Sequence, residues 1–125
     1  MDTNFIFSQT DTRPMYLQIM EQVKQRIAVG DWPAGTKMPS IRELVVGIKV
    51  SVITVKRAYL ELERNGVIVT RQGKGSWVSA EVDAADLRRQ ELEQLLRRVT
   101  DLAESMSIDK KELMSLLQQT IEKER

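Results

Sequence analysis

Residues 40–66 read SIRELVVGIKVSVITVKRAYLELERNG and contain two helix-start signals that lie eleven residues apart. Ser40 and Glu43 have the spacing of a capping box, in which each side chain bonds the backbone N–H of the other residue. Ser51 is the N-cap that a second helix requires, and Asn65-Gly66 is a typical helix end. Apolar residues recur at three- and four-residue steps after each cap. The stretch therefore predicts two short amphipathic helices joined by a tight turn.

The flanking segments complete a recognisable order of elements. A third amphipathic helix is expected from Pro14 to Gly30, ahead of the quoted stretch. After it, the β-rich runs 67–70 and 76–79 enclose the basic loop 71–75, which predicts a small hairpin with a flexible tip. Helix, helix, turn, helix and hairpin within about 65 residues is the order of a winged helix-turn-helix. The expected fold is mostly α with a small β-hairpin, and the winged body should span residues 13–79 after an N-terminal extension, 1–12.

Residues 80–125 change in composition and form a separate helical segment. Two amphipathic helices are expected, interrupted between Ser107 and Asp109, where Asp109 with Glu112 gives another cap signal. The apolar stripe could form the core of an internal helical hairpin or an interface between two chains. Two helices alone bury little, so dimerisation is favoured. The candidate dimerisation residues are Leu92, Leu95, Leu96, Val99, Leu102, Met106, Leu113, Leu116, Leu117 and Ile121.

Composition excludes several classes of function. The 125 residues include no cysteine and no histidine, so disulfides, thiol nucleophiles, cysteine–histidine zinc sites and histidine bases are ruled out. No cofactor or metal is expected, and the chain is not expected to be an enzyme. The loop Gly73-Lys74-Gly75-Ser76 lacks the spacing of a nucleotide-binding loop. With no signal peptide and no apolar run of about 20 residues, the chain is expected to be soluble and cytoplasmic, without a membrane partner.

The net charge of +1 hides an uneven distribution. Residues 13–78 contain eleven basic and five acidic side chains, a net charge of +6, whereas residues 79–125 contain eight and eleven, a net charge of −3. A basic body followed by an acidic tail segment favours a polyanion as the partner of the body.

The chain resembles the GntR family of bacterial transcription regulators. The matching pieces lie in order within residues 14–78: PMYLQI from Pro14, GTKMPSIREL from Gly35, then Thr54-Val55, Ala58-Tyr59 and GKGSWV from Gly73. The short helical C-terminus is similar to that of the YtrA subfamily. This resemblance implies a winged-helix DNA-binding domain, a helical dimerisation segment and control of nearby transport genes. One departure is that Val52 and Ile53 stand where family members often carry an arginine.

The candidate DNA-binding residues come from three places. Arg42 lies in the first turn of the middle helix, which helix-turn-helix geometry places across the DNA backbone. In the next helix, with Val55 facing inward, Ile53 points roughly outward, where it either touches a thymine methyl or packs in the turn. The glycine-containing hairpin tip brings a lysine to or beside the minor groove. The full set is Arg42, Ser51, Val52, Ile53, Thr54, Lys56, Arg57, Gln72, Gly73 and Lys74.

The sequence therefore predicts a homodimeric repressor that binds a palindromic operator in double-stranded DNA, associated with the bacterial nucleoid. A winged-helix module for protein–protein interaction is the alternative, and RNA binding stays open. The sequence identifies neither a small-molecule effector nor the operator. The two tyrosines and two tryptophans are expected to pack rather than to stack on bases: Tyr16, Trp32, Tyr59 and Trp77.

Overall fold

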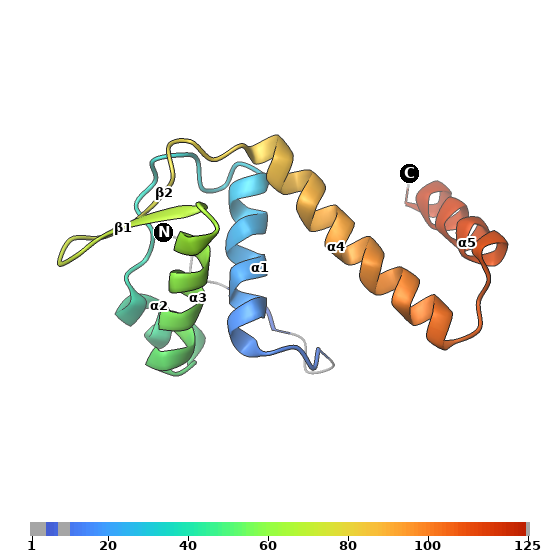
Figure 1. Cartoon of the computed structure of the whole chain (residues 1–125), viewed down its shortest axis with the longest axis horizontal. Helices are drawn as coiled ribbons and strands as arrows, with labels where there is room; N and C mark the ends of the chain where they lie inside the picture. Colours follow the sequence, from blue (N-terminus) through green and yellow to red (C-terminus); the bar gives the residue numbers. More distant parts are fainter. Residues whose placement is uncertain (1–4, 8–10, 125) are drawn as a thin grey trace. The chain divides into compact units, whose positions relative to one another are not determined.

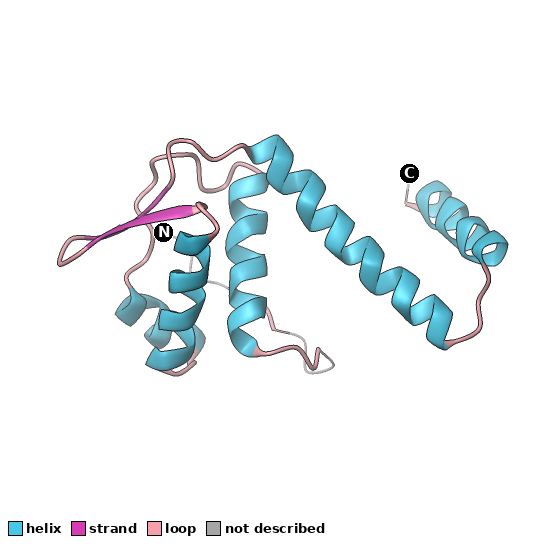
Figure 2. Ribbon diagram, in the orientation of Figure 1, coloured by secondary structure: helices cyan, strands magenta, loops and turns pink. Residues whose placement is uncertain are grey.

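The computed structural model describes residues 5–7 and 11–124, and these fall into two compact units that meet at residues 91 and 92. Helices dominate both units, and the strands are confined to one hairpin (Figure 2). This confirms the expected mostly α fold with a small β-hairpin. The elements, labelled in Figure 1, are α1 (Met15–Ala28), α2 (Ile41–Ile48), α3 (Val52–Arg64), β1 (Ile68–Arg71), β2 (Gly75–Val78), α4 (Ala84–Ser105) and α5 (Lys110–Lys123).

The caps of α2 and α3 form as the sequence predicts. The Ser40 side chain accepts a hydrogen bond from the Glu43 N–H at 3.0 Å, and the Ser40 N–H donates to the Glu43 carboxylate at 3.2 Å. These bonds lower the pKa of Glu43, because they favour its ionised form. At α3, the Thr54 N–H donates to the Ser51 hydroxyl at 3.2 Å. Lys49, with φ at 56°, ends α2 in the left-handed conformation and turns the chain toward Ser51.

The core of the body forms around α3, which packs against α1, α2 and β1. Val55 and Leu62 on α3, and Leu44 on α2, are fully buried. Tyr59 is also buried, and its hydroxyl donates to the Pro39 carbonyl at 2.6 Å. Burial raises the pKa of Tyr59, so this donor stays protonated. Trp32 lies in the same core, which confirms that both of these aromatic residues pack.

Helix α1 ends two residues before the glycine that the sequence marks as its end. The Val29 N–H bonds the Gln25 carbonyl and the Gly30 N–H bonds the Ile27 carbonyl, so the last turn tightens. Gly30 then takes a φ of 89°, which closes the turn. Ile27 and Ala28, the last two residues of the buried face, are 2% and 3% exposed.

The hairpin strands reach further into the expected loop than the sequence predicts. Arg71 pairs with Gly75, which leaves Gln72-Gly73-Lys74 as the tip. The Lys74 N–H donates to the Arg71 carbonyl at 2.9 Å, and Gly73 has a φ of 76°. Glycine suits this position because it has no Cβ to strain the left-handed backbone.

A short segment after the α1–α2 turn fixes the hairpin to the body. The Met38 N–H donates to the Ser76 carbonyl and the Val78 N–H to the Thr36 carbonyl, both at 2.8 Å. These bonds cover the outer edge of β2, so the direction in which the hairpin tip projects is set by the body.

The winged body extends beyond residue 79, where the sequence places its end. Leu87, in the first turn of α4, joins the hydrophobic core, and the Arg88 guanidinium donates to the Ala28 carbonyl at 2.9 Å. Glu91 is only 6% exposed. Burial raises its pKa, more than the nearby cations Lys24 and Arg13 lower it. The first turns of α4 are therefore part of the body.

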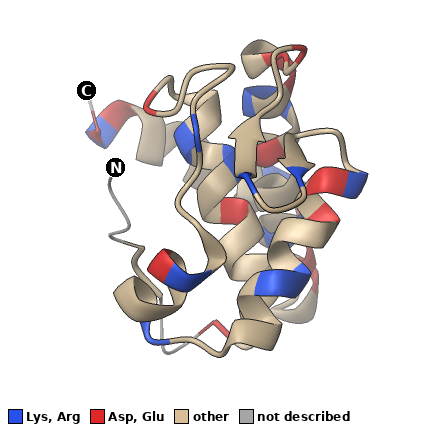
Figure 3. Ribbon diagram, turned by 90° about the vertical axis from the view of Figure 1, so that its left-hand side faces the viewer, with Lys and Arg blue, Asp and Glu red and all other residues tan. Residues whose placement is uncertain are grey.

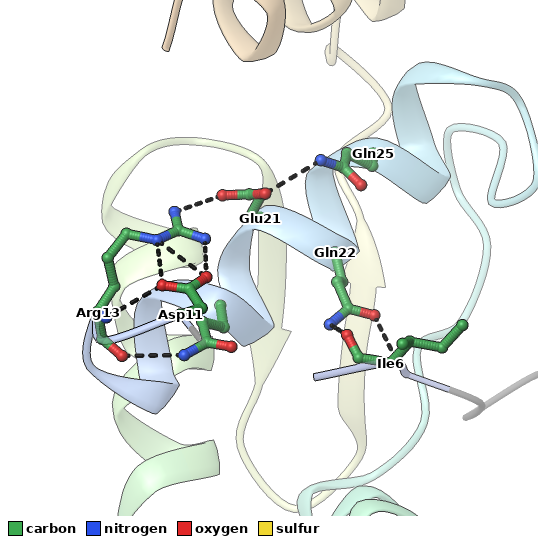
Figure 4. Close-up of polar contacts among 7 residues, drawn as sticks. Ile6, Asp11, Arg13, Glu21, Gln22 and Gln25 are labelled. Carbon is green, nitrogen blue, oxygen red and sulfur yellow. Dashed lines mark hydrogen bonds and ion pairs between the residues drawn. The ribbon is translucent and has the colours of Figure 1, made fainter. Parts of the chain in front are cut away.

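Part of the N-terminal extension also packs on the body (Figure 4). The Gln22 side chain holds the backbone of Ile6 with a donated and an accepted hydrogen bond, of 2.6 and 2.9 Å. The Phe5 ring lies near Trp32, with 6.3 Å between centroids. Arg13 bonds both Asp11 and Glu21, an arrangement that raises the pKa of its guanidinium. Residues 1–4 and 8–10 of the predicted extension lie outside the described residues.

The C-terminal unit, residues 92–125, consists of the rest of α4 and α5. The helix break lies where the sequence predicts it: the Ile108 N–H donates to the Ala103 carbonyl at 2.9 Å, and Ser107 takes a φ of 58°. Asp109 then caps α5 by accepting from the Glu112 N–H at 2.8 Å.

The apolar stripe of this unit remains exposed, and α4 and α5 do not form the extensive mutual contact that an internal hairpin core would require. Leu113 is half-buried, and the other predicted members are between 38% and 62% exposed. The stripe is called the C-terminal stripe below and comprises Leu92, Leu95, Leu96, Val99, Leu102, Met106, Leu113, Leu116, Leu117 and Ile121.

Within the described residues, no helix is both long enough and apolar enough to cross a membrane.

Candidate DNA interface

The start of α3 presents two apolar side chains to solvent. Ile53 is 79% exposed and Val52 is 52% exposed, so neither packs in the turn. The neighbouring hydroxyls are engaged locally, because Ser51 Oγ and Thr54 Oγ1 lie 2.8 Å apart and Ser51 also caps the helix. The first turn of α3 thus combines internally satisfied polar groups with a free apolar surface.

Exposed cationic side chains lie on each of the three elements that carry predicted contacts. Arg42 is exposed in the first turn of α2, and Lys56 is exposed one turn into α3. Lys74 is exposed at the hairpin tip. In the part of the chain that the structure describes, none of these three side chains forms an ion pair, a hydrogen bond or a ring contact, so their charges are available to phosphates. Figure 3 shows basic segments on the hairpin and on neighbouring helices, with acidic segments among them.

Arg57 is placed differently from the other predicted contacts. Its guanidinium lies over the ring of Tyr16, 3.9 Å from the ring centroid, and donates to the Tyr16 hydroxyl at 3.3 Å. This cation–π contact ties α3 to the start of α1 and fixes the direction of the arginine. Tyr16 is half-buried and packs against the hydrophobic core, as the sequence predicts, while its ring also supports the Arg57 guanidinium.

The hairpin carries a second aromatic residue with cations beside it. Trp77 is half-buried, and Lys37 Nζ and Arg71 Cζ lie 5.7 and 5.9 Å from its ring. A Cβ added at Gly75 would come within 3.2 Å of the Lys37 side chain, so this glycine makes room for the lysine. The tip residues Gln72, Gly73 and Lys74 are all exposed beyond this cluster.

The structure brings the predicted site residues together on one unit. All ten lie on α2, the turn before α3, α3 or the hairpin tip, within residues 1–91. The Arg57–Tyr16 pair was missed by sequence reasoning, because the two residues are 41 positions apart. Its only sequence signal is a tyrosine in the first turn of α1.

The described residues contain no group of three or more acidic side chains placed to hold a metal ion. The arrangement of a capped exposed helix, flanking cations and a basic hairpin tip is instead suited to a nucleic-acid backbone and groove.

Comparisons with known protein sequences agree with this arrangement. The family model described as "Bacterial regulatory proteins, gntR family" matches residues 15–78. The uncharacterized HTH-type transcriptional regulator YhcF of Bacillus subtilis (strain 168) is 33% identical over 107 residues, which cover 82% of this chain and 85% of YhcF. The HTH-type transcriptional repressor YtrA of the same organism is 44% identical over 66 residues, covering 53% of this chain and 51% of YtrA. The match to YtrA therefore spans about half of each protein.

Solved structures show the same relationship. A GntR family transcriptional regulator from Listeria monocytogenes has a TM-score of 0.73 at 28% identity, covering 90% of this chain and 98% of that one. AraR(DBD), solved in complex with operator ORX1, has a TM-score of 0.54 at 27% identity, covering 59% of this chain and 93% of that one. With a family model that matches more than half of its length, the chain belongs to the GntR family and is a DNA-binding transcriptional regulator, not an enzyme.

Proposed function

We propose that this regulator is a homodimeric repressor that binds a palindromic operator. The observation that carries the DNA-binding mode is the exposed start of α3, together with the exposed cations of α2, α3 and the hairpin tip. In this mode α3 enters the major groove, Arg42 and Lys56 bind phosphates, and Lys74 lies in or beside the minor groove. Gln72, Gly73, Ser51 and Thr54 complete the contact surface.

Arg57 has a supporting role in this proposal. Its guanidinium is already bound to Tyr16, so it reaches DNA only at the phosphate nearest to α1. An arginine held over a ring loses less side-chain entropy on binding than a free one, because its direction is set beforehand.

The C-terminal stripe supports dimerisation. It places a continuous series of large apolar side chains in solvent, which monomeric proteins rarely do over such a length. Pairing the stripes of two copies would remove them from water, and a two-fold dimer presents two copies of α3 to two half-sites. The symmetry of such a dimer is what requires a palindromic operator.

The repressor role and the regulated genes are inferred from relatives. YtrA is named a transcriptional repressor. Control of nearby transport genes is what the resemblance to the YtrA subfamily implies. A repressor of this kind acts in the cytoplasm, at the nucleoid.

The dimer is tested with charge placed inside and outside the stripe. Val99→Glu adds a carboxylate to the middle of the stripe, whereas Gln94→Glu adds the same charge on the opposite face of α4. Sedimentation equilibrium should give a dimer for the wild-type chain and for Gln94→Glu, and a monomer for Val99→Glu. The monomeric variant should bind a full operator far more weakly, since its second half-site contact is no longer intramolecular.

Two results would count against the proposal. A Val99→Glu variant that remains dimeric would move the interface away from the stripe. A wild-type chain that binds no duplex DNA, but retains a protein from solution, would favour the protein–protein interaction module.

A further inference from the structure

The apolar pair at the start of α3 has no role in the fold. Ile53 is 79% exposed and Val52 is 52% exposed, and neither belongs to the hydrophobic core. β-branched residues also form helices less readily than straight-chain ones, so an exposed valine and isoleucine at this position add nothing to the stability of the helix. Two such residues in succession at an exposed helix start therefore point to a partner outside the body.

The position of the pair identifies what that partner offers. The flanking cations Arg42 and Lys56 are suited to phosphates, and the first turn of a recognition helix is the part that faces base edges. A base pair presents donors, acceptors and a single kind of apolar group in the major groove, the C5-methyl of thymine. An isoleucine and a valine have no hydrogen-bonding group, so the methyl is the feature that they can recognise.

The remaining polar groups of this turn do not compete for the same role. The Ser51 hydroxyl caps the helix by accepting the Thr54 N–H, and it lies 2.8 Å from the Thr54 hydroxyl, so the two hydroxyls are bonded to each other. Lys56 follows Ile53 by three residues, about 4.5 Å along the helix axis. That spacing is slightly more than one base-pair step, about 3.4 Å.

We propose that Val52 and Ile53 are specificity-determining residues that read the methyl group of a thymine in each operator half-site, in place of a guanine read by hydrogen bonds. The proposal rests on the proposed insertion of α3 into the major groove. Ile53 makes the principal contact because it is the more exposed of the two, and Val52 borders the same methyl.

Replacing thymine by uracil tests this directly, because uracil lacks only the methyl group and keeps the same base pairing. Burial of one methyl-sized group is worth about fourfold in affinity. A site with both thymines replaced should therefore bind the dimer about fifteenfold more weakly. The probe is a duplex enriched from a randomised pool by the wild-type chain, with each thymine of the half-site replaced in turn. We expect the loss at one or two adjacent positions and no effect elsewhere.

Ile53→Ala should bind the thymine duplex more weakly and no longer distinguish it from the uracil duplex. Its melting temperature should match that of the wild type, because the side chain is exposed. Val29→Ala is the matched control: Val29 is also a branched aliphatic residue, 68% exposed, and lies at the C-terminal end of α1. This control should keep the full difference between thymine and uracil.

The two levels of the proposal fail differently. If the wild-type chain binds the thymine and uracil duplexes equally, α3 reads DNA by other means, so the thymine contact is wrong and the proposed function stands. If Ile53→Ala lowers the melting temperature and keeps the base preference, the side chain is a packing residue and the inference is overturned. If no duplex is enriched, both the proposed function and the inference are wrong.

Discussion

Loss of one lysine at the hairpin tip should change the salt dependence of DNA binding by an amount that follows from the number of cations in the proposed interface. Arg42, Lys56 and Lys74 are the cations of the proposed interface whose side chains have no partner among the described residues, so the proposed dimer would make about six phosphate contacts. Each contact contributes about −0.9 to the slope of log affinity against log salt, so the expected slope is about −5.4. Affinity should fall about 2,000-fold between about 50 and 200 mM salt.

Lys74→Ala removes two of these contacts from the dimer. The slope should become shallower by about 2, and the loss of affinity over the same salt range should shrink to about 150-fold. Because a phosphate contact carries no base information, the variant should weaken specific and non-specific duplexes to a similar degree. Fluorescence anisotropy titrations of a labelled duplex at four salt concentrations measure both quantities.

Arg64→Ala provides the matched control for this experiment. This substitution also removes one positive charge from α3, but Arg64 lies in the last turn of the helix and pairs with Glu61 at 2.8 Å. Its slope should equal that of the wild type. The reasoning would be refuted if Lys74→Ala kept the wild-type slope, or if Arg64→Ala reduced the slope to the same extent.

The remaining predictions concern the stability of the body. Ser40→Ala should destabilise the chain by about 1 kcal/mol in a denaturant titration, because it removes the N-cap of α2; an unchanged midpoint would show that the cap contributes nothing. A fragment of residues 1–91 should fold as a monomer, and a fragment ending at residue 79 should be about 2 kcal/mol less stable because it lacks buried Leu87; equal stability would place the end of the body at residue 79. Glu91→Gln should raise the melting temperature at neutral pH. The folded-state pKa of Glu91 lies above its usual 4.5, so the buried carboxyl costs stability as the pH rises through that raised pKa. The gain should vanish in acid, where Glu91 is protonated, and a gain seen only in acid would contradict this sign.

The starts of α2, α3 and α5 could be predicted because their capping signals are local. The capping pair Ser40 and Glu43, the cap Ser51 and the cap Asp109 all form the bonds that their spacing predicts. Each bond joins residues three positions apart, so the sequence contains both partners within one helical turn. The exposed position of Ile53 followed in the same way from the helical period, counted from buried Val55.

The extent of the body could not be predicted, because it depends on contacts between distant segments. Helix α4 is continuous, and its amphipathic pattern gives no sign that Leu87 and Glu91 are buried against the body while later residues are not. The Arg57–Tyr16 contact and the packing of Phe5 beside Trp32 are likewise tertiary. Nothing in the local sequence around either residue of such a pair specifies its partner.

Selection of binding sites from randomised duplex DNA tests most directly whether two copies of α3 read two equivalent half-sites. The expected result is an inverted repeat whose half-sites are centred about one helical turn apart, or a multiple of it, each with a thymine where α3 begins. Enrichment of a single unsymmetrical motif would contradict the symmetric dimer, and a pool without any enriched sequence would contradict sequence-specific binding by α3.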